Sequence, residues 1–272
     1  MTEAPPYDDV VVVTGATGGL GRVIVDGLID DGRIVIAQFH TDAIGVQALR
    51  VAAEQKGGTC VPVQAELSTS AGAEAFVDAV AALLSKNESW RLRGLINNAA
   101  LVLGPGFGST TADLFDRYVA VNVRAPFLLT QALSSLMEDG SSIVNISSAG
   151  VTFSSPGDIV YVMTKAALES LTRHAAEPLA RRGIRINAVV AGFTDNGHPG
   201  YQFAKVRDHL GAFAALGGIA EPEVISDAVR FLLSPASRRS TGSLLDVSGG
   251  STLGVPRPGG SIRDLAQNHP SA

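Results

Sequence analysis

The sequence predicts one α/β domain in which a doubly wound parallel sheet is covered by helices on both faces. Short runs rich in β-branched residues alternate with longer helical patterns along the chain, which indicates right-handed crossovers between parallel strands. The runs are apolar at successive positions, as strands buried on both faces are. No repeat or linker divides the 272 residues, so we expect a single domain.

The first strand, residues 10–13, consists of four valines and is too apolar to face water on either side. A glycine-rich turn at residues 14–21 leads directly into a helix whose apolar positions recur with helical spacing. Residues 34–39 form the second strand and close the first βαβ unit. The other predicted helices cover residues 41–56, 71–85, 114–137, 158–182 and 224–233, and the other predicted strands cover residues 60–63, 92–98, 142–147, 184–190 and 243–247.

The composition is that of a soluble globular protein, with 46% hydrophobic and 17% charged residues. The net charge of -5 gives no electrostatic reason to expect binding to nucleic acid or to an anionic membrane. No apolar run reaches the ~18–20 residues that a membrane span requires, and the first residues do not form a signal peptide. With Cys60 as the only cysteine, no intramolecular disulfide can form. We therefore expect a cytoplasmic protein.

The glycine-rich turn reads Thr-Gly-Ala-Thr-Gly-Gly-Leu-Gly and lies between a strand and a helix. Glycines at such a turn let backbone N–H groups approach a phosphate, and the helix N-terminus adds a favourable dipole. Glycine also serves any tight turn, but the strand–turn–helix context favours dinucleotide binding. The candidate cofactor-binding residues of this turn are Thr14, Gly15, Thr17, Gly18, Gly19, Leu20 and Gly21.

The end of the second strand bears on the choice of dinucleotide. In dinucleotide folds an acidic residue near this point holds the ribose hydroxyls of NAD. This chain has Phe39 and His40 there, and the first acid is Asp42. Without a carboxylate a 2′-phosphate is not repelled, and His40 can donate a hydrogen bond to one. No arginine stands there in the sequence, and His40 can equally be a solvated loop residue. We predict that NADP(H) is favoured over NAD(H).

Tyr161 and Lys165 are four residues apart, so they share one face of the predicted helix. A phenol ordinarily titrates near pH 10, and an ammonium group one turn away is expected to lower its pKa toward the working range. Ser148 follows an apolar strand and can place its hydroxyl beside the same reacting oxygen. A Tyr-x-x-x-Lys pair alone usually marks only an amphipathic helix; the motifs elsewhere in the chain give this pair its significance.

Five motifs occur in order: Thr-Gly-x-x-x-Gly-x-Gly at residues 14–21, Asn-Asn-Ala at residues 97–99, Val-Asn-Val around Asn122, Ser148 with Tyr161 and Lys165, and Asp-Val-Ser-Gly-Gly at residues 246–250. With these motifs, residues 8–253 resemble the short-chain dehydrogenase/reductase family, which has a single Rossmann-type domain. The resemblance implies an NAD(P)-dependent oxidoreductase that interconverts a ketone and a secondary alcohol by hydride transfer. We expect it to reduce its substrate with NADPH.

The resemblance also implies roles for individual residues. Tyr161 is the general acid in reduction or base in oxidation, and Ser148 hydrogen-bonds the substrate oxygen. Lys165 holds the nicotinamide ribose and lowers the pKa of Tyr161, while Asn122 anchors a water that links Lys165 to solvent. Gly15, Gly19 and Gly21 are expected along the pyrophosphate. The other implied cofactor-binding residues are Glu66, Leu67, Asn98, Ala99, Ala100, Ala191, Gly192, Phe193 and Thr194.

Four positions depart from the family pattern. Ala100 replaces a glycine, Glu66 an aspartate that contacts adenine, and Ala191 a proline. Asn196 stands where a threonine often meets the nicotinamide carboxamide, with Thr194 as a substitute. None of these changes removes a group needed for hydride transfer, so they bear on cofactor affinity rather than on the type of reaction.

Residues 193–218 resemble the variable substrate lid of the family, and their five glycines suggest mobility. The candidate substrate-contacting residues are Val151, Phe153, Tyr201 and Phe203, each of which could also be ordinary core. The expected substrate is a small carbonyl or alcohol compound, and no residue spacing indicates a metal site. Residues 254–272 are expected to be a flexible extension or an arm that contacts a neighbouring subunit.

We also expect a homo-oligomer, a tetramer or a dimer, from the family resemblance and from apolar residues on the outer faces of the helices at residues 114–137 and 158–182. Two other functions fit the fold. A cofactor-binding sensor or scaffold would lack the catalytic residues, which are intact here. An epimerase or dehydratase of the extended branch would normally have a longer chain and Gly-x-x-Gly-x-x-Gly at the first turn, whereas Gly15, Gly19 and Gly21 have the reductase spacing.

Overall fold

The computed structural model describes residues 8–197 and 199–253 and contains a seven-stranded parallel sheet in the order β3-β2-β1-β4-β5-β6-β7. The strands are β1 (Asp8–Val13), β2 (Ile34–Phe39), β3 (Thr59–Gln64), β4 (Trp90–Asn97), β5 (Ser142–Ser148), β6 (Arg185–Ala191) and β7 (Leu244–Val247). The α-helices are α1 (Gly19–Asp30), α2 (Ala43–Gln55), α3 (Ser70–Lys86), α4 (Ala112–Val119), α5 (Ala125–Leu136), α6 (Ile159–Ala180), α7 (Ala204–Gly211) and α8 (Pro222–Leu233). The predicted fold class is confirmed, and the predicted extension at residues 254–272 lies outside the described residues.

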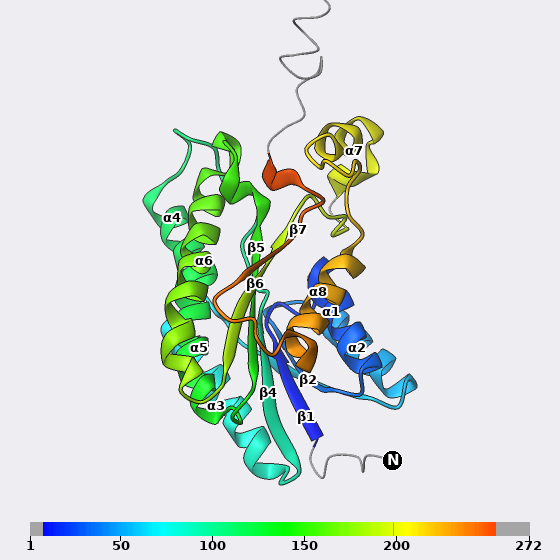
Figure 1. The fold of residues 1–272 in the computed structure, drawn as a ribbon, viewed down its shortest axis with the longest axis vertical. Helices are drawn as coiled ribbons and strands as arrows, with labels where there is room; N and C mark the ends of the chain where they lie inside the picture. The colour runs from blue at the N-terminus through cyan, green and yellow to red at the C-terminus, as the bar shows by residue number, and fades with distance from the viewer. Residues whose placement is uncertain (1–7, 198, 254–272) are drawn as a thin grey trace, which may run out of the picture.

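Helices cover both faces of the sheet. Figure 1 shows α3, α5 and α6 on one side and α1, α2 and α8 on the other. The four valines predicted to be buried divide between the two layers: Val10 and Val12 join the apolar cluster with α3 and α5, and Val11 and Val13 join the cluster with α1 and α8. All four side chains are fully buried. The strand therefore needs apolar residues at every position because both of its faces are packed.

The strand order reverses direction between β1 and β4. From β1 the chain builds outward through β2 and β3, then crosses to β4 and continues to β7 on the other side. In such sheets the crevice at the carboxyl ends of the strands, beside this reversal, is the usual ligand-binding position. Helix α7 lies beyond the same ends of the strands, next to β7 in Figure 1. The fold thus directs attention to the turns after β1, β4, β5 and β6.

Two predicted elements differ in the structure. The helix predicted over residues 114–137 consists of α4, a π-helical turn at Ala120–Arg124 and α5. The sequence pattern did not reveal this break because a π turn preserves the helical run while adding one residue to it. The predicted lid contains more regular structure than its glycines suggest, since it includes α7 and a β-bridge between Thr194 and Ala220.

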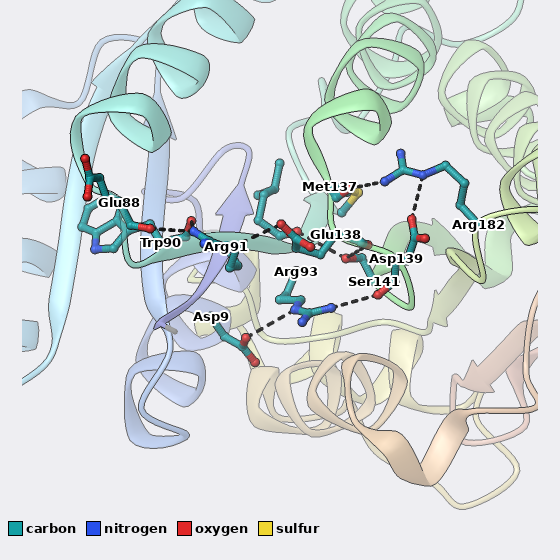
Figure 2. Close-up of polar contacts among 11 residues, drawn as sticks. Asp9, Glu88, Trp90, Arg91, Arg93, Met137, Glu138, Asp139, Ser141 and Arg182 are labelled. Carbon is teal, nitrogen blue, oxygen red and sulfur yellow. Dashed lines mark hydrogen bonds and ion pairs between the residues drawn. The ribbon is translucent and has the colours of Figure 1, made fainter. Parts of the chain in front are cut away.

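The opposite end of the sheet carries ion pairs. Arg93 on β4 lies between Asp9 on β1, 3.6 Å away, and the backbone carbonyl of Asp139, 2.9 Å away (Figure 2). Arg182, just after α6, donates to the Asp139 carboxylate at 2.8 Å. These partly exposed pairs contribute at most about 1 kcal/mol each, so they join neighbouring elements at the surface. Among the described residues no helix is long and apolar enough to cross a membrane.

Candidate active site

The glycine-rich turn brings three backbone segments into close contact. Gly15 has a φ of +63°, and a Cβ there would lie 2.8 Å from Cα of Ala99. A Cβ on Gly21 would lie 2.2 Å from the carbonyl oxygen of Gly15. The N-terminus of α1 follows without a side-chain cap and without an acidic residue in its first turn. This turn therefore presents backbone N–H groups and a positive dipole end, which suit a pyrophosphate.

Thr14 and Asn98 hold this turn against the end of β4. The Thr14 hydroxyl accepts hydrogen bonds from the backbone N–H groups of Asn98 and Ala99, both at 3.0 Å. The Asn98 side chain donates to the carbonyls of Thr14 and Gly15, at 2.9 and 3.0 Å. Thr14 was predicted to bind the cofactor, but its side chain is buried and does not line the cavity beside the turn. It supports the glycine-rich turn from beneath.

A cavity of about 400 Å³ opens beside this turn at the strand reversal. Most of the predicted cofactor-binding residues line it: Gly15, Thr17, Gly18, Gly19, Leu20, Gly21, His40, Glu66, Leu67, Asn98, Ala99 and Ala100. Sequence reasoning missed Gln38 and Arg117, which also line it. Gln38 accepts from the Gly15 N–H at 2.8 Å and donates to the Ala65 carbonyl at 2.8 Å. Alternation along β2 places Gln38 and Phe39 on opposite faces of the sheet, but it does not tell which face meets the cavity.

The predicted role of Phe39 needs correction. Its side chain is buried in the apolar cluster with α1 and does not line the cavity. Neighbouring residues of a strand face opposite sides, so Gln38 and His40 line the cavity and Phe39 between them does not. The His40 Nε2 lies 2.5 Å from an oxygen of Glu66, and both side chains are substantially exposed. This part of the cavity is therefore lined by His40 after β2, by Glu66 after β3 and by Asp42, which is paired with Arg22 at 2.8 Å. No carboxylate lies on β2 itself.

A second cavity, of about 370 Å³, lies beside the carboxyl ends of β5 and β6. Ser148 and Tyr161 line it together, as do Ala191, Gly192, Phe193 and Thr194. It adjoins the first cavity, since Leu20, Val102 and Asn196 line both. Ser147 turns its hydroxyl to Glu169 at 2.8 Å. Ser148, not its neighbour, therefore has its hydroxyl available beside the phenol.

Lys165 is almost fully buried behind Tyr161. Its Nζ donates to the Ile146 carbonyl at 2.7 Å and lies 5.6 Å from the centroid of the Tyr161 ring. Burial lowers the pKa of Lys165 to about 8. The pKa of Tyr161 is raised to about 12, mainly by burial and in part by the negative charge of Asp158, while the hydrogen bond with Ser148 has a lowering effect. The expected lowering of the Tyr161 pKa is therefore wrong for this structure, because loss of hydration outweighs the other effects.

Asn122 lies in the π-helical turn between α4 and α5 and is buried. Its side chain accepts from Leu101 N at 2.8 Å and donates to the Leu101 carbonyl at 2.9 Å and to the Thr164 hydroxyl at 3.0 Å. It thereby joins the loop after β4 to α6 one residue before Lys165. Both hydrogens of its side-chain amide are engaged, so a water could bond only to the second lone pair of Oδ1 or to the backbone of Asn122.

The predicted substrate-contacting residues fall into two pairs. Phe153 and Tyr201 line the second cavity, but Val151 and Phe203 do not. Val151 is partly buried in the 3-10 turn Ala149–Thr152, of which Ala149 and Gly150 line the cavity instead. Phe203 precedes α7 with 65% of its surface exposed. Which lid residues face inward depends on the position of α7 over the cavity, and a local sequence pattern does not contain this information. Sequence reasoning also missed Val102, Leu103, Ser155, Asp158, Val162 and Val206, which line the cavity.

The lid rests directly on the glycine-rich turn. A Cβ on Gly19 would lie 2.0 Å from the carbonyl oxygen of Asn196. The lid is held further by the Asp195–Arg207 ion pair, at 2.7 Å, and by packing of Phe213 against Phe153, with ring centroids 5.3 Å apart. Gly19 is therefore required for contact with the lid as well as for the turn.

The fold and the two adjoining cavities define a dinucleotide-binding α/β enzyme. The family description "Enoyl-(Acyl carrier protein) reductase" matches residues 15–252. The mouse (3R)-3-hydroxyacyl-CoA dehydrogenase is 32% identical over 250 residues, which cover 89% of this chain and 95% of that protein. The chain belongs to the short-chain dehydrogenase/reductase family and is an NAD(P)-dependent oxidoreductase acting on CH–OH and C=O groups.

Solved structures agree with this assignment. The angucycline C-6 ketoreductase LanV with bound NADP superposes with a TM-score of 0.87 and 35% identity, covering 92% of this chain and 97% of that one. The reductase LugOII, which catalyses keto-reduction at C1 during lugdunomycin biosynthesis, gives a TM-score of 0.87 and 34% identity, covering 92% of this chain and 100% of that one. Among the described residues no group of three or more His, Cys, Asp and Glu is placed to hold a metal ion.

Replacing Gly19 with alanine is expected to displace the lid. The added Cβ cannot fit against the Asn196 carbonyl, so residues 193–220 must move and their backbone amides should exchange with solvent at least about tenfold faster. Gly18→Ala is the matched control, because the nearest atom to its Cβ is 3.4 Å away. Hydrogen exchange read by mass spectrometry measures both variants. Equal protection of the lid in Gly19→Ala and Gly18→Ala would contradict the contact.

Proposed function

We propose that the protein reduces a ketone to a secondary alcohol with NADPH, and that Tyr161, Ser148, Lys165 and Asn122 form its catalytic site. The observation that carries this proposal is that Ser148 and Tyr161 face one cavity, which adjoins the glycine-lined cavity suited to a dinucleotide. A substrate carbonyl in the second cavity would thus lie beside both a proton donor and the expected nicotinamide position. The named functions of the ketoreductases LanV and LugOII support the same direction.

The residues fit a nicotinamide dinucleotide, which supplies the hydride when bound. Gly15, Gly19 and Gly21 would pass close to the pyrophosphate, and Lys165 would hold the nicotinamide ribose. Tyr161 keeps its proton at neutral pH because its pKa is raised to about 12. It is therefore suited to act as a general acid toward a carbonyl oxygen, and Ser148 donates a second hydrogen bond to that oxygen as negative charge develops on it.

Lys165 has a second function in this proposal. Its ammonium lies against the Tyr161 ring and, with a pKa lowered to about 8, carries a proton near neutral pH that it can also release. It can therefore favour the phenolate that forms when Tyr161 gives up its proton, and then help to return a proton to it. The side chain of Asn122, in the π-helical turn, donates a hydrogen bond to the Thr164 hydroxyl. This bond holds the neighbouring part of α6 in position.

Replacing Tyr161 with phenylalanine is expected to lower kcat by at least ~10²–10⁴-fold, because the ring remains but its proton is lost. NADP(H) affinity should stay nearly unchanged, since the phenol hydroxyl is a minor part of that contact. Ser148→Ala should slow mainly the chemical step, and Lys165→Ala should impair both turnover and NADP(H) binding. Oxidation of NADPH at 340 nm in a screen of ketones measures turnover, and a fluorescence titration measures binding. Substantial turnover by Tyr161→Phe would refute its assignment as proton donor.

NADP(H) is expected to bind more tightly than NAD(H). The cavity at the end of β2 contains His40 and Arg117 among its lining residues, and NADP is bound in the LanV structure. We propose that His40 donates to the 2′-phosphate when freed from Glu66. His40→Asp should then weaken NADP(H) binding at least about tenfold through like-charge repulsion and leave NAD(H) binding unchanged. Position 39 is unsuited to this test because its side chain is buried.

Titration of both dinucleotides into the wild type, His40→Asp and the neutral variant His40→Asn measures this preference. The Asn variant separates loss of the histidine from gain of a negative charge. Tighter binding of NAD(H) than of NADP(H) by the wild type would overturn the cofactor assignment, whereas equal effects of both variants would limit the role of His40 to its hydrogen bond.

We propose that the protein is a homo-oligomer that pairs through the outer faces of α5 and α6. A groove of about 430 Å³ lies there, lined by Phe127, Ala167, Leu171 and His174 among others, and Phe127 is 48% exposed. Phe127→Glu should convert the oligomer to a smaller species in sedimentation velocity, because the buried charge would lack a partner. Phe107→Glu, at a more exposed site outside the groove, is the control. A monomeric wild type at micromolar concentration would contradict the proposal.

A further inference from the structure

Asp158 is a carboxylate in the second cavity for which the proposed chemistry has no use. It stands at the N-cap of α6, three residues before Tyr161, where an aspartate commonly accepts hydrogen bonds from the first turn of the helix. Its side chain makes no such capping bond here. It lines the cavity together with Tyr161 and Ser155, and the Ser155 hydroxyl donates to it at 3.4 Å. The position of this side chain is therefore not explained by helix capping.

No side-chain cation balances the charge of Asp158 within the cavity, and only the N-terminus of α6 favours it. No lysine, arginine or histidine is among the residues that line the cavity, and Asp158 is the only acid among them. Within residues 8–197 and 199–253 no ion pair involves it. Two neighbouring phenols respond to its charge, since Asp158 contributes to raising the pKa of Tyr161 and of Tyr118. A substrate in this cavity would therefore meet one negative charge close to the reacting group.

The other walls of the cavity are mainly apolar. Val102 and Leu103 from the loop after β4, Phe153, and Val206 and Leu210 from α7 line it. Apolar walls cannot discriminate strongly between substrates that differ in one polar group, whereas a carboxylate that faces the cavity can, because a bound substrate must either hydrogen-bond to it or remove its hydration. The strongest source of polar selectivity in the cavity is thus this single group.

We propose that Asp158 is a specificity-determining residue that selects carbonyl substrates bearing a hydroxyl or ammonium group and disfavours those bearing a carboxylate. This inference rests on the proposed function, because it concerns the same cavity. An ionised carboxylate only accepts hydrogen bonds, and those from an ammonium or hydroxyl group are charge-assisted. A second carboxylate in the same cavity would be repelled. Ser155, 3.4 Å away, can give its hydrogen bond up to the substrate donor.

The test uses acetophenones substituted at the meta or para position with aminomethyl, hydroxymethyl, ethyl or carboxylate groups. For the wild type at pH 7, kcat/KM for the aminomethyl ketone is expected to exceed that for the ethyl ketone about tenfold. The value for the carboxylate ketone should be at least about tenfold below that for the ethyl ketone. Asp158→Asn keeps the shape of the side chain and removes its charge, so all four values should come within about threefold. Asp227→Asn, on α8 and outside the cavity, is the control of equal charge change and should retain the wild-type order.

Binding of the same four ketones to the complex with oxidised NADP+, which cannot reduce them, is measured by calorimetry and separates this inference from the proposed function. Absence of turnover with every ketone would count against the proposed function, while the order of binding affinities would still decide the role of Asp158. Equal affinity of the wild type for the aminomethyl and ethyl ketones would overturn the inference, whether or not the variants fold. An unchanged order in Asp158→Asn would overturn it as well.

Discussion

Close approach of backbone to backbone at the glycine-rich turn is the constraint on which the rest of the site depends. Gly15 lies against Ala99 after β4, and Gly19 lies against Asn196 after β6. One short turn, which follows β1, therefore sets the position of two segments that follow β4 and β6 on the other side of the strand reversal. Any side chain at these two positions would separate them, because the clashes are with backbone and not with movable side chains. The two cavities adjoin one another for this reason.

Burial controls the acid–base character of the second cavity. Lys165 and Tyr161 are both driven toward their neutral forms, the lysine to a pKa of about 8 and the tyrosine to about 12. Loss of hydration opposes any charge, whereas an attractive pair would have moved the two values in the other directions. A phenol that retains its proton is suited to donate it to a carbonyl oxygen. The protonated phenol is the form that the proposed reduction uses.

The sequence could predict what depends on local pattern. The alternation of strands and helices, the valines of β1 and the four-residue spacing of Tyr161 and Lys165 each follow from periodicity, and the structure has them. It could not predict the side on which Phe39 lies, because that requires the register of β2 against its neighbours. It also could not predict that burial would reverse the expected pKa shift of Tyr161, since the degree of burial depends on segments distant in sequence. Asp158 was overlooked because a residue at a helix N-cap has a sufficient local explanation until its contacts are known.

A buried chain of polar side chains connects the strands and the helix that carry the proposed catalytic residues. Asn97, at the end of β4, donates to the side-chain oxygen of Asn145 on β5 at 2.8 Å, and Asn145 donates to the Thr172 hydroxyl on α6 at 2.8 Å. All three residues are buried, so loss of one partner would leave a polar group unsatisfied at a cost of about 1–3 kcal/mol. The bonds connect β5, which ends in Ser148, with α6, which carries Tyr161. The neighbouring residues Asn97 and Asn98 thus hold different parts of the site: Asn97 bonds to β5, and Asn98 bonds to the glycine-rich turn.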